Sequence, residues 1–180
     1  MRNLDDAPIG SESYFGYSIA SSFGGNRKDI GKVDVAVGAP RARAMKGAVL
    51  LYSRSMTHIM TIDGPQTGSY FGASVAIVDI NGDGWYDLVV GSPVYNNVGS
   101  DSDSGVEQGA VFVLYRSGNK PFSIDNAVVL VGSKAYARYG NALVNAGDLN
   151  HDFYEDFAVG EPNGGDNGNG AVYVYFGRQG

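Results

Sequence analysis

Two short acidic stretches carry oxygen-bearing side chains at a regular spacing. The first, residues 79–87, reads DINGDGWYD, and its relative positions one, three, five and nine are Asp79, Asn81, Asp83 and Asp87. Calcium takes about six to eight oxygen ligands, and a tight loop with oxygens on alternate residues can direct them at one centre. Gly84, at position six, can adopt the left-handed backbone conformation that such a curl needs. The stretch therefore predicts a calcium loop, with the carbonyl of Trp85 as a backbone ligand.

The second stretch, residues 148–156, repeats the pattern. It reads DLNHDFYED, and the same four positions are Asp148, Asn150, Asp152 and Asp156, with Tyr154 in the place of Trp85. Phe153 replaces the glycine at position six, and a non-glycine residue held at positive φ costs on the order of 1 kcal/mol or more. We therefore expect about two calcium ions per chain, with the second site the weaker.

The alternative for each stretch is a turn that binds nothing, because Asn, Asp and Gly are favoured in turns. The recurrence of four oxygen-bearing residues at one spacing favours metal binding over chance. The flanking residues 74–78 and 88–90 are β-branched or aliphatic, and no Glu follows at position twelve. The loops are therefore predicted to connect strands rather than helices.

Composition excludes several classes of function. The chain has 180 residues, a net charge of −6 and no cysteine. A nucleic-acid partner is not expected, because such proteins carry a basic stripe. Neither His58 nor His151 has an Asp or Ser partner at a catalytic spacing, and no glycine loop could cradle a phosphate, so an enzyme is not expected.

Three sequence landmarks recur in a fixed order along the chain. Each unit begins with an aromatic residue followed by glycine, in the pairs Phe15-Gly16, Phe71-Gly72 and Tyr139-Gly140. Each continues with Gly-x-Pro at residues 38–40, 91–93 and 160–162, and then with an apolar strand after Gly47, Gly109 and Gly170. Repeats of several tens of residues indicate stacked supersecondary units.

Each unit is predicted to be a small antiparallel sheet. Gly, Asp and Pro separate the apolar runs, and no run has a helical period of helical length. A fourth strand is predicted at residues 57–62 and 127–131, and none after residues 172–176. Four antiparallel strands per repeat is the blade of a β-propeller, so the fold class is all-β, with blades at approximately residues 14–63, 70–131 and 139–180.

The order of these motifs resembles the FG-GAP repeats of integrin α-subunit propellers. The resemblance rests on the aromatic-Gly pairs, on Asp-x-Asn-x-Asp-Gly-x-x-Asp at residues 79–87 and on Gly-Ala-Pro at residues 38–40. It covers nearly the whole chain and implies three consecutive blades of a seven-bladed propeller. It also implies the extracellular part of a single-pass cell-surface receptor that pairs with an integrin β subunit and binds extracellular matrix. An FG-GAP module of a non-integrin extracellular protein, with a structural or carbohydrate-binding role, is the alternative.

The first unit departs from the metal pattern. Counting back from Asp34, the equivalent positions are Asn26, Lys28 and Ile30, and lysine and isoleucine cannot coordinate calcium. A blade that lacks the metal loop and precedes two blades that carry it resembles the arrangement in the laminin-binding α subunits. The acid that Arg-Gly-Asp readers of the family place before this FG pair corresponds to about Ser11, with Glu12 beside it. A laminin-like ligand is therefore favoured over an Arg-Gly-Asp ligand.

Strand alternation predicts which loops share a rim. The metal loops join first and second strands, so the loops between second and third strands must lie at the opposite rim with the linkers between units. That rim carries residues 10–13, 41–46, 63–69, 95–108, 132–138 and 163–169. Arg41 and Arg43 could bind an acidic partner there or simply be solvated. The acidic insert with Asp101, Asp103 and Glu107 could be a third metal site, although its Gly/Ser content favours a flexible loop.

Three blades cannot close a ring, which typically needs four to eight. The outer faces of the first and third units should then lack a neighbour, and the third unit should have an unpaired edge. We therefore expect the isolated chain to self-associate or to be stable only within a larger propeller.

Overall fold

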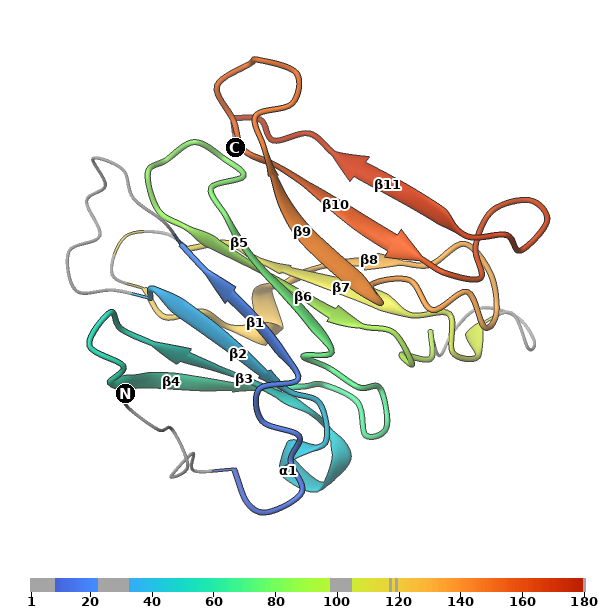
Figure 1. Ribbon diagram of the computed structural model, residues 1–180, viewed down its shortest axis with the longest axis horizontal. Helices are drawn as coiled ribbons and strands as arrows, with labels where there is room; N and C mark the ends of the chain where they lie inside the picture. Colours follow the sequence, from blue (N-terminus) through green and yellow to red (C-terminus); the bar gives the residue numbers. More distant parts are fainter. Residues whose placement is uncertain (1–8, 23–32, 98–104, 117, 119, 180) are drawn as a thin grey trace.

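The computed structural model describes residues 9–22, 33–97, 105–116, 118 and 120–179. Within them the chain forms three antiparallel sheets (Figure 1). The first contains β1 (Ser18–Ser21), β2 (Val35–Ala39), β3 (Ala48–Tyr52) and β4 (His58–Asp63). The second contains β5 (Ser74–Val78), β6 (Asp87–Ser92), β7 (Ala110–Leu114) and β8 (Val128–Val131). The third contains β9 (Ala142–Gly147), β10 (Asp156–Glu161) and β11 (Ala171–Tyr175).

Each sheet is a simple meander in which every strand pairs with the next one in sequence. The strands form where β-branched and aliphatic residues cluster, and they end at Gly, Asp and Pro, which favour turns. Two short helical turns accompany them in the described residues, α1 (Ala42–Met45) and η2 (Ile124–Asn126). Neither is long and apolar enough to cross a membrane. The expected all-β fold, with blade-like sheets of four, four and three strands, is confirmed.

The sheets stack face to face, with their first strands β1, β5 and β9 adjacent (Figure 1). One apolar core lies between the first and second sheets and includes Phe71, Leu88 and Phe112. Another lies between the second and third and includes Val89, Tyr139 and Phe157. The aromatic residues of the second and third aromatic-Gly pairs, Phe71 and Tyr139, are thus core residues between blades.

A recurrent hydrogen bond from a serine hydroxyl to a glycine carbonyl links neighbouring sheets. The N–H of Gly72 donates to the carbonyl of Gly91 in its own blade. The carbonyl of Gly72 accepts a hydrogen bond from Ser18 Oγ of the preceding blade, at 2.9 Å. The carbonyl of Gly140 likewise accepts from Ser74 Oγ, at 2.6 Å. The glycines of the two repeated motifs therefore let one backbone approach the next closely, which a side chain would prevent.

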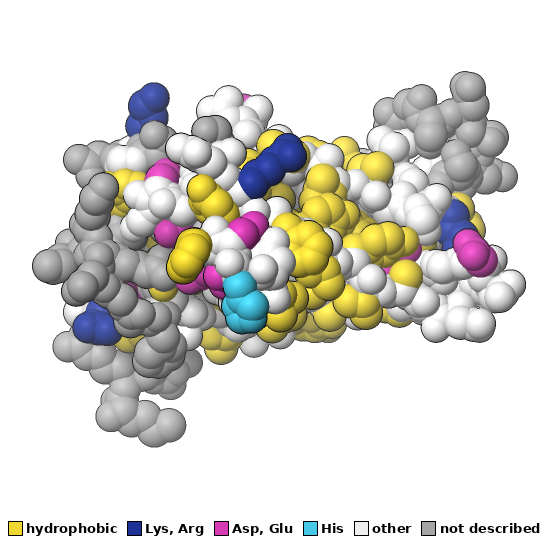
Figure 2. All heavy atoms as spheres, turned by 90° about the horizontal axis from the view of Figure 1, so that it is seen from above, with side chains coloured by type: hydrophobic (Ala, Val, Ile, Leu, Met, Phe, Trp, Pro, Cys, Tyr) yellow, Lys and Arg dark blue, Asp and Glu magenta, His cyan; other side chains and the backbone are white. Residues whose placement is uncertain are grey.

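The two terminal faces of the stack differ. On the first sheet, Val37, Leu50 and Tyr52 are buried beneath a cluster that includes Ile9 and Ala42, so the expectation of a bare apolar face is wrong there. The outer face of the third sheet is exposed, as expected: Val144, Val172 and Val174 have exposed fractions of 55%, 72% and 42%. Figure 2 shows hydrophobic side chains gathered over this end of the molecule. Ile9 and Ala42 pack over the outer face of the first sheet, whereas within the part of the chain that the structure describes no segment packs over the outer face of the third.

Candidate metal centre

The first acidic loop connects β5 to β6, between strands as predicted. Its first and last carboxylates, Asp79 and Asp87, are buried, whereas Asn81 and Asp83 lie nearer the surface. Gly84 has φ of 84°, the left-handed conformation expected at position six. The backbone thus curls as a cation-binding loop requires.

Side-chain oxygens of the loop accept hydrogen bonds from its own backbone. Asp79 Oδ2 accepts from the N–H of Gly84 at 3.1 Å. Asn81 Oδ1 accepts from the N–H of Asp83 at 3.0 Å, and Asp83 Oδ1 from that of Trp85 at 2.8 Å. These contacts fix the loop around the side chains at positions one, three and five.

The second loop, between β9 and β10, repeats this arrangement contact by contact. Asp148 Oδ2 accepts from the N–H of Phe153 at 2.9 Å. Asn150 Oδ1 accepts from that of Asp152 at 3.2 Å, and Asp152 Oδ1 from that of Tyr154 at 3.0 Å. The two stretches share a loop conformation as well as a sequence pattern.

Position six of the second loop holds Phe153 with a φ of 74°. A non-glycine residue thus has the left-handed conformation at this position, as predicted from the sequence. The side chain is 94% exposed and therefore gains almost no burial energy there. A left-handed conformation without compensating packing costs on the order of 1 kcal/mol. The second loop is thus the more strained of the two.

The aspartate at position nine has a structural role that sequence reasoning missed. Asp87 Oδ1 accepts from the N–H of Arg116, two residues beyond β7, and Oδ2 accepts from Ile80. Asp156 makes the matching bonds to the N–H groups of Gly177 and Leu149. Asp34, whose blade lacks the metal pattern, accepts from the N–H of Arg54 at the corresponding place. In all three blades this carboxylate binds a backbone N–H two residues beyond the third strand. The recurrence of aspartate at residue 34, in the blade that lacks the metal pattern, was the sequence signal for this role.

The first loop creates a negative local field. Burial is the main cause that raises the pKa of Asp87 to about 7, opposed by the N–H groups of Arg116 and Ile80 and reinforced by the charges of Asp83 and Asp79. A bound cation would favour the ionised carboxylates by direct attraction. The loop is therefore electrostatically suited to a divalent ion.

The donor set fits calcium in chemistry, since it offers carboxylate and amide oxygens only. Among the described residues, no group of three or more His, Asp or Glu side chains is already gathered closely enough to hold a metal. The carboxylates turn instead to N–H groups of the loop. Each carboxylate oxygen has two lone pairs, so these contacts leave it capacity for a cation. The predicted ligands thus remain a prediction, with Asp79, Asn81, Asp83, Asp87 and the Trp85 carbonyl in one loop and Asp148, Asn150, Asp152, Asp156 and the Tyr154 carbonyl in the other.

The two loops lie side by side at one rim and contact each other (Figure 1). The N–H of Asp79 donates to Glu155 Oε2 at 3.0 Å, and the N–H of Glu155 donates back to the carbonyl of Asp79. The Tyr154 ring lies over Gly82 so closely that a Cβ at residue 82 would come within 2.7 Å of it. In the first loop, the Arg116 guanidinium stacks on the Trp85 ring, 5.1 Å from its centroid. The side chains at position seven, Trp85 and Tyr154, are therefore both packed against neighbouring residues.

The opposite rim is built from linkers and the loops between second and third strands, as alternation predicts. Gln66, in the linker after β4, exchanges two hydrogen bonds with the backbone of Asn96, beyond β6. The Arg41 guanidinium stacks on Tyr14 and donates to its hydroxyl. Arg43 and Glu107 form ion pairs with Asp63 and Arg138.

Two sequence predictions fall outside the described residues. These are the metal-free assignment of Asn26, Lys28 and Ile30 and the acidic positions Asp101 and Asp103. Glu107, the third residue of the acidic insert, is described and pairs with Arg138. Its carboxylate therefore has a partner other than a metal.

Comparison with known proteins identifies the repeats. The FG-GAP repeat family model matches residues 71–114 and 139–175. The chain is 36% identical to integrin alpha-PS2 of Drosophila melanogaster over 177 residues, which cover 96% of this chain and 12% of that protein. It is 38% identical to integrin alpha-V of Gallus gallus over 169 residues, 93% of this chain and 16% of that protein. It is 33% identical to integrin alpha-5 of Xenopus laevis over 181 residues, 100% of this chain and 17% of that protein.

The chain therefore spans less than a fifth of the length of these relatives. The matched proteins include several α-subunit types and do not favour the laminin-binding ones. Integrin α subunits are adhesion receptors, so the expectation that the chain is not an enzyme is confirmed. With its repeated motifs, its blade-like sheets and this similarity along nearly all of its length, the chain matches the FG-GAP repeat segment of integrin α subunits.

Proposed function

We propose that this chain is a calcium-stabilised part of the ligand-binding head of an adhesion receptor. The head stands outside the cell, pairs with an integrin β subunit and binds extracellular matrix. The observation that carries the proposal is the separation of two rims within an integrin α segment. Two acidic loops with matching hydrogen bonds lie at one rim, and the linkers and longer loops lie at the other. Calcium would then be structural, and the opposite rim would contact the β subunit or the matrix.

The structural role of calcium follows from where the loops lie. They connect the first two strands of neighbouring blades and hydrogen-bond to each other through Asp79 and Glu155. A cation held by Asp79, Asn81, Asp83 and Asp87 would neutralise carboxylates beside this contact. Its charge would offset the negative charge of these carboxylates and so stabilise the fold of the loop.

Exposed basic side chains of the opposite rim provide the test. Charge reversal by Arg43→Glu and Lys46→Glu should weaken matrix or β-subunit binding by about tenfold, because charge complementarity at an interface is lost. Calcium affinity should not change, because these residues lie far from the acidic loops. The measurements are surface plasmon resonance of the full receptor ectodomain on matrix proteins, copurification with the β subunit and calorimetric calcium titration.

Arg54→Glu is the matched control. Arg54 is also exposed, but it follows β3 and lies at the rim of the acidic loops. Its reversal should leave matrix and β-subunit binding within about twofold of the unmodified receptor. If Arg54→Glu weakens binding and the Arg43 and Lys46 variants do not, the assignment of the two rims is wrong.

Among matrix ligands, we propose a laminin-like protein ahead of one recognised through Arg-Gly-Asp. The support is the sequence alone: Asn26, Lys28 and Ile30 replace the metal pattern in the first unit, and Ser11 stands where an acid would be expected. Binding of the receptor ectodomain to laminin and to an Arg-Gly-Asp matrix protein, compared side by side, decides between them. Preferential binding to the Arg-Gly-Asp protein would contradict the proposal.

The strain at Phe153 gives a prediction about the calcium affinity of the second loop. Phe153→Gly should tighten the second site by up to about fivefold, because glycine reaches positive φ without the penalty of about 1 kcal/mol. The reciprocal change Gly84→Phe should weaken the first site, since a side chain there meets no atom within 4 Å and only the strain is added. Calorimetric calcium titration of both variants measures the effects. Unchanged affinity in both would remove the strain argument.

The exposed face of the third sheet supports the expectation of self-association. Val172 and Val174 of β11 are exposed. Hydrophobic side chains gather over this end of the molecule (Figure 2). The isolated chain should therefore sediment as a dimer or larger species, and Val172→Lys with Val174→Lys should shift it toward monomer. Ile59→Lys, an exposed position on β4 of the first sheet, is the control. A compact monomer of the unmodified chain at micromolar concentration in sedimentation velocity would contradict this expectation.

A further inference from the structure

The two acidic loops are joined through Glu155, which is position eight of the second loop. Its carboxylate accepts a hydrogen bond from the N–H of Asp79 at 3.0 Å, and its own N–H donates to the Asp79 carbonyl at 3.4 Å. Asp79 is position one of the first loop, and Glu155 follows Tyr154 and precedes Asp156, two predicted ligand residues of the second. A residue held between two predicted ligands of one loop thus binds both backbone groups of a predicted ligand of the other.

Asn145, on β9, holds the Glu155 carboxylate in this position. Asn145 Nδ2 donates to Glu155 Oε2 at 3.0 Å and to the carbonyl of Ile77, on β5, at 2.9 Å. Asn145 Oδ1 accepts from the N–H of Gly147 at 2.9 Å, so both ends of the amide are fixed. Hydrogen bonds to an ionised carboxylate are about twice as strong as those between neutral groups. The contact between the loops is therefore held firmly from both blades.

The segment that follows β11 makes a second connection. The N–H of Gly177 donates to Asp156 Oδ1 at 2.9 Å, and the N–H of Arg178 donates to the carbonyl of Ile80 at 3.0 Å. The N–H of Ile80 donates in turn to Asp87 Oδ2 at 3.2 Å. Backbone groups of three residues thus link the position-nine carboxylates of the two loops.

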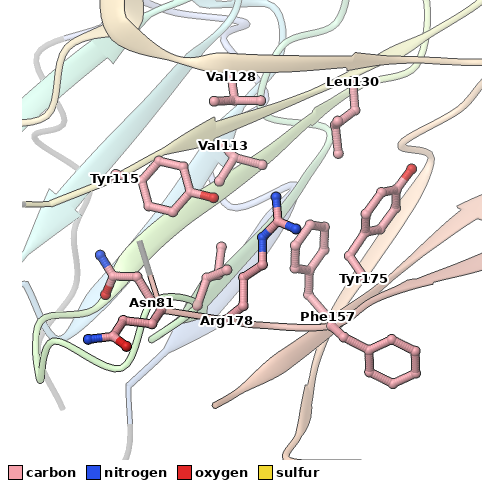
Figure 3. Close-up of a pocket in the computed structure, with 11 residues that line it drawn as sticks. Asn81, Val113, Tyr115, Val128, Leu130, Phe157, Tyr175 and Arg178 are labelled. Atoms are coloured by element: carbon pink, nitrogen blue, oxygen red, sulfur yellow. The ribbon is translucent and has the colours of Figure 1, made fainter.

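Gly177 lies between the loops at a place that has no room for a side chain. A Cβ at residue 177 would come within 2.6 Å of the carbonyl oxygens of Ile80 and Glu155, one from each loop. The same segment borders a recess of about 630 Å³ between the second and third sheets, which Arg178 and Asn81 of the first loop both line (Figure 3). The backbone of this segment therefore packs directly against both loops.

These contacts make the order of one loop depend on the order of the other. A loop that binds a cation loses conformational freedom when its ligands are fixed, and that loss opposes binding. Binding at the first loop fixes Asp79 and, through it, Glu155. Tyr154 and Asp156 on either side of Glu155 then have less freedom to lose when the second loop binds. The contacts therefore favour positive coupling between the two sites.

Charge acts in the opposite sense to these contacts. Residues 79–87 contain three aspartates, and residues 148–156 contain three aspartates and one glutamate. A divalent cation in one loop makes the field at the other less negative, which weakens cation binding there. Coupling through the contacts is therefore the change in affinity that remains when the charge of the neighbouring loop is held constant.

We propose that the hydrogen bonds between the loops couple their calcium sites positively, with Glu155 as the positioning residue. The proposal rests on the proposed function, because both loops must hold calcium. It adds that the second and third blades form one calcium-dependent unit, in which loss of either cation loosens both loops.

Calorimetric calcium titration of the full chain measures the coupling. In the unmodified chain the first loop, predicted to be the tighter, is already filled when the second binds. Asp79→Asn with Asp83→Asn keeps the first loop empty, and it removes two negative charges, the number that a calcium ion would offset. Asparagine retains an oxygen for the N–H groups of Gly84 and Trp85. The second loop should bind at least about fivefold more tightly in the unmodified chain than in this paired variant, the lower end of coupling between protein sites.

Emission from Trp85 identifies which loop fills at each step of the titration. Trp85 is the only tryptophan of the chain and is position seven of the first loop. Its emission should change in the first step of the unmodified chain and stay constant in the paired variant. The single step that remains in the variant is then binding at the second loop.

Three substitutions test the role of Glu155, each compared with and without the paired variant. Glu155→Ala removes the bond to Asp79 and should reduce the fivefold ratio to less than about twofold. Glu155→Gln keeps an oxygen that can accept the same N–H groups and should retain the ratio. Glu107→Ala is the matched control, because this glutamate also contacts another loop, through Arg138, but lies at the opposite rim. The ratio should be unchanged in it.

Hydrogen exchange of the unmodified chain gives a test that needs no change at Glu155. At a calcium concentration that fills only the first loop, amides of residues 148–156 should already exchange more slowly than in the metal-free chain. Mass spectrometry of the peptides that cover this segment measures the effect.

Equal affinity of the second loop in the unmodified chain and the paired variant overturns the coupling and leaves the proposed calcium binding intact. Absence of calcium binding in the unmodified chain overturns both. Unchanged exchange of residues 148–156 also contradicts the coupling. If Glu155→Gln or Glu107→Ala lowers the ratio as much as Glu155→Ala, the hydrogen bond of Glu155 is not what couples the sites.

Discussion

Addition of calcium to the metal-free chain is expected to raise its thermal unfolding midpoint by about 10–20 °C when both acidic loops are saturated. A ligand that binds only the folded state at 100 times its dissociation constant adds about 2.7 kcal/mol per site. Each kcal/mol raises the midpoint of a domain of this size by about 2–4 °C. The physical cause is that a bound cation favours ionised carboxylates in the folded chain, including Asp87, whose pKa is raised mainly by burial and further by the charges of Asp83 and Asp79. Differential scanning calorimetry with and without calcium measures the shift.

The paired substitution Asp83→Asn and Asp152→Asn isolates the metal contribution. Asparagine keeps an oxygen that can accept the N–H groups of Trp85 and Tyr154 and removes one charge from each loop. The calcium-induced shift should fall by more than half, because these loops lose a carboxylate ligand each. Asp125→Asn, at an exposed aspartate in η2, should leave the shift intact. An undiminished shift in the paired variant would show that calcium stabilises the chain elsewhere.

Gly91→Ala is expected to destabilise the chain by about 3 kcal/mol or more, because it would force the second and third blades apart. A Cβ at residue 91 would lie 2.1 Å from both the Gly140 carbonyl oxygen and Ser74 Oγ. The first of these atoms is backbone and cannot rotate away. The hydrogen bond from Ser74 to Gly140 would also be lost. Thermal or urea unfolding of the variant measures the effect.

Gly160→Ala is the internal control for this prediction. Gly160 is the equivalent glycine of the third blade, and the nearest atom to an added Cβ is Ala142 Cβ at 3.3 Å. Its change in stability should be under about 1 kcal/mol, since no backbone group of another blade lies against it. Equal destabilisation by the two alanines would mean that glycine is required within the strand itself, and the argument from blade packing would fail.

Local pattern was sufficient for much of this protein. Alternating apolar runs bounded by Gly, Asp and Pro located the strands, because strand formation and turn formation depend on neighbouring residues. The repeated motifs predicted blade-like sheets, and the four oxygens at fixed spacing located both acidic loops. Even the left-handed conformation of Phe153 followed from its alignment with Gly84. The alternation of strand direction along the chain was enough to assign each loop to its rim, since every antiparallel strand runs opposite to the one before it.

Other features depended on groups that meet only when the blades stack. The bond between Asp87 and Arg116 joins residues 29 positions apart, and the bond between Ser74 and Gly140 joins residues 66 apart, so no local pattern specifies either. The cover over Leu50 and Tyr52 and the recess beside Phe157 likewise depend on which segments reach each face of a sheet. Spacing along the sequence therefore determined the repeats, the strands and the candidate ligands of this chain. Its tertiary structure decided which carboxylates tie strands together, how closely the blades approach and where a face stays open, because those properties arise from contacts between distant residues.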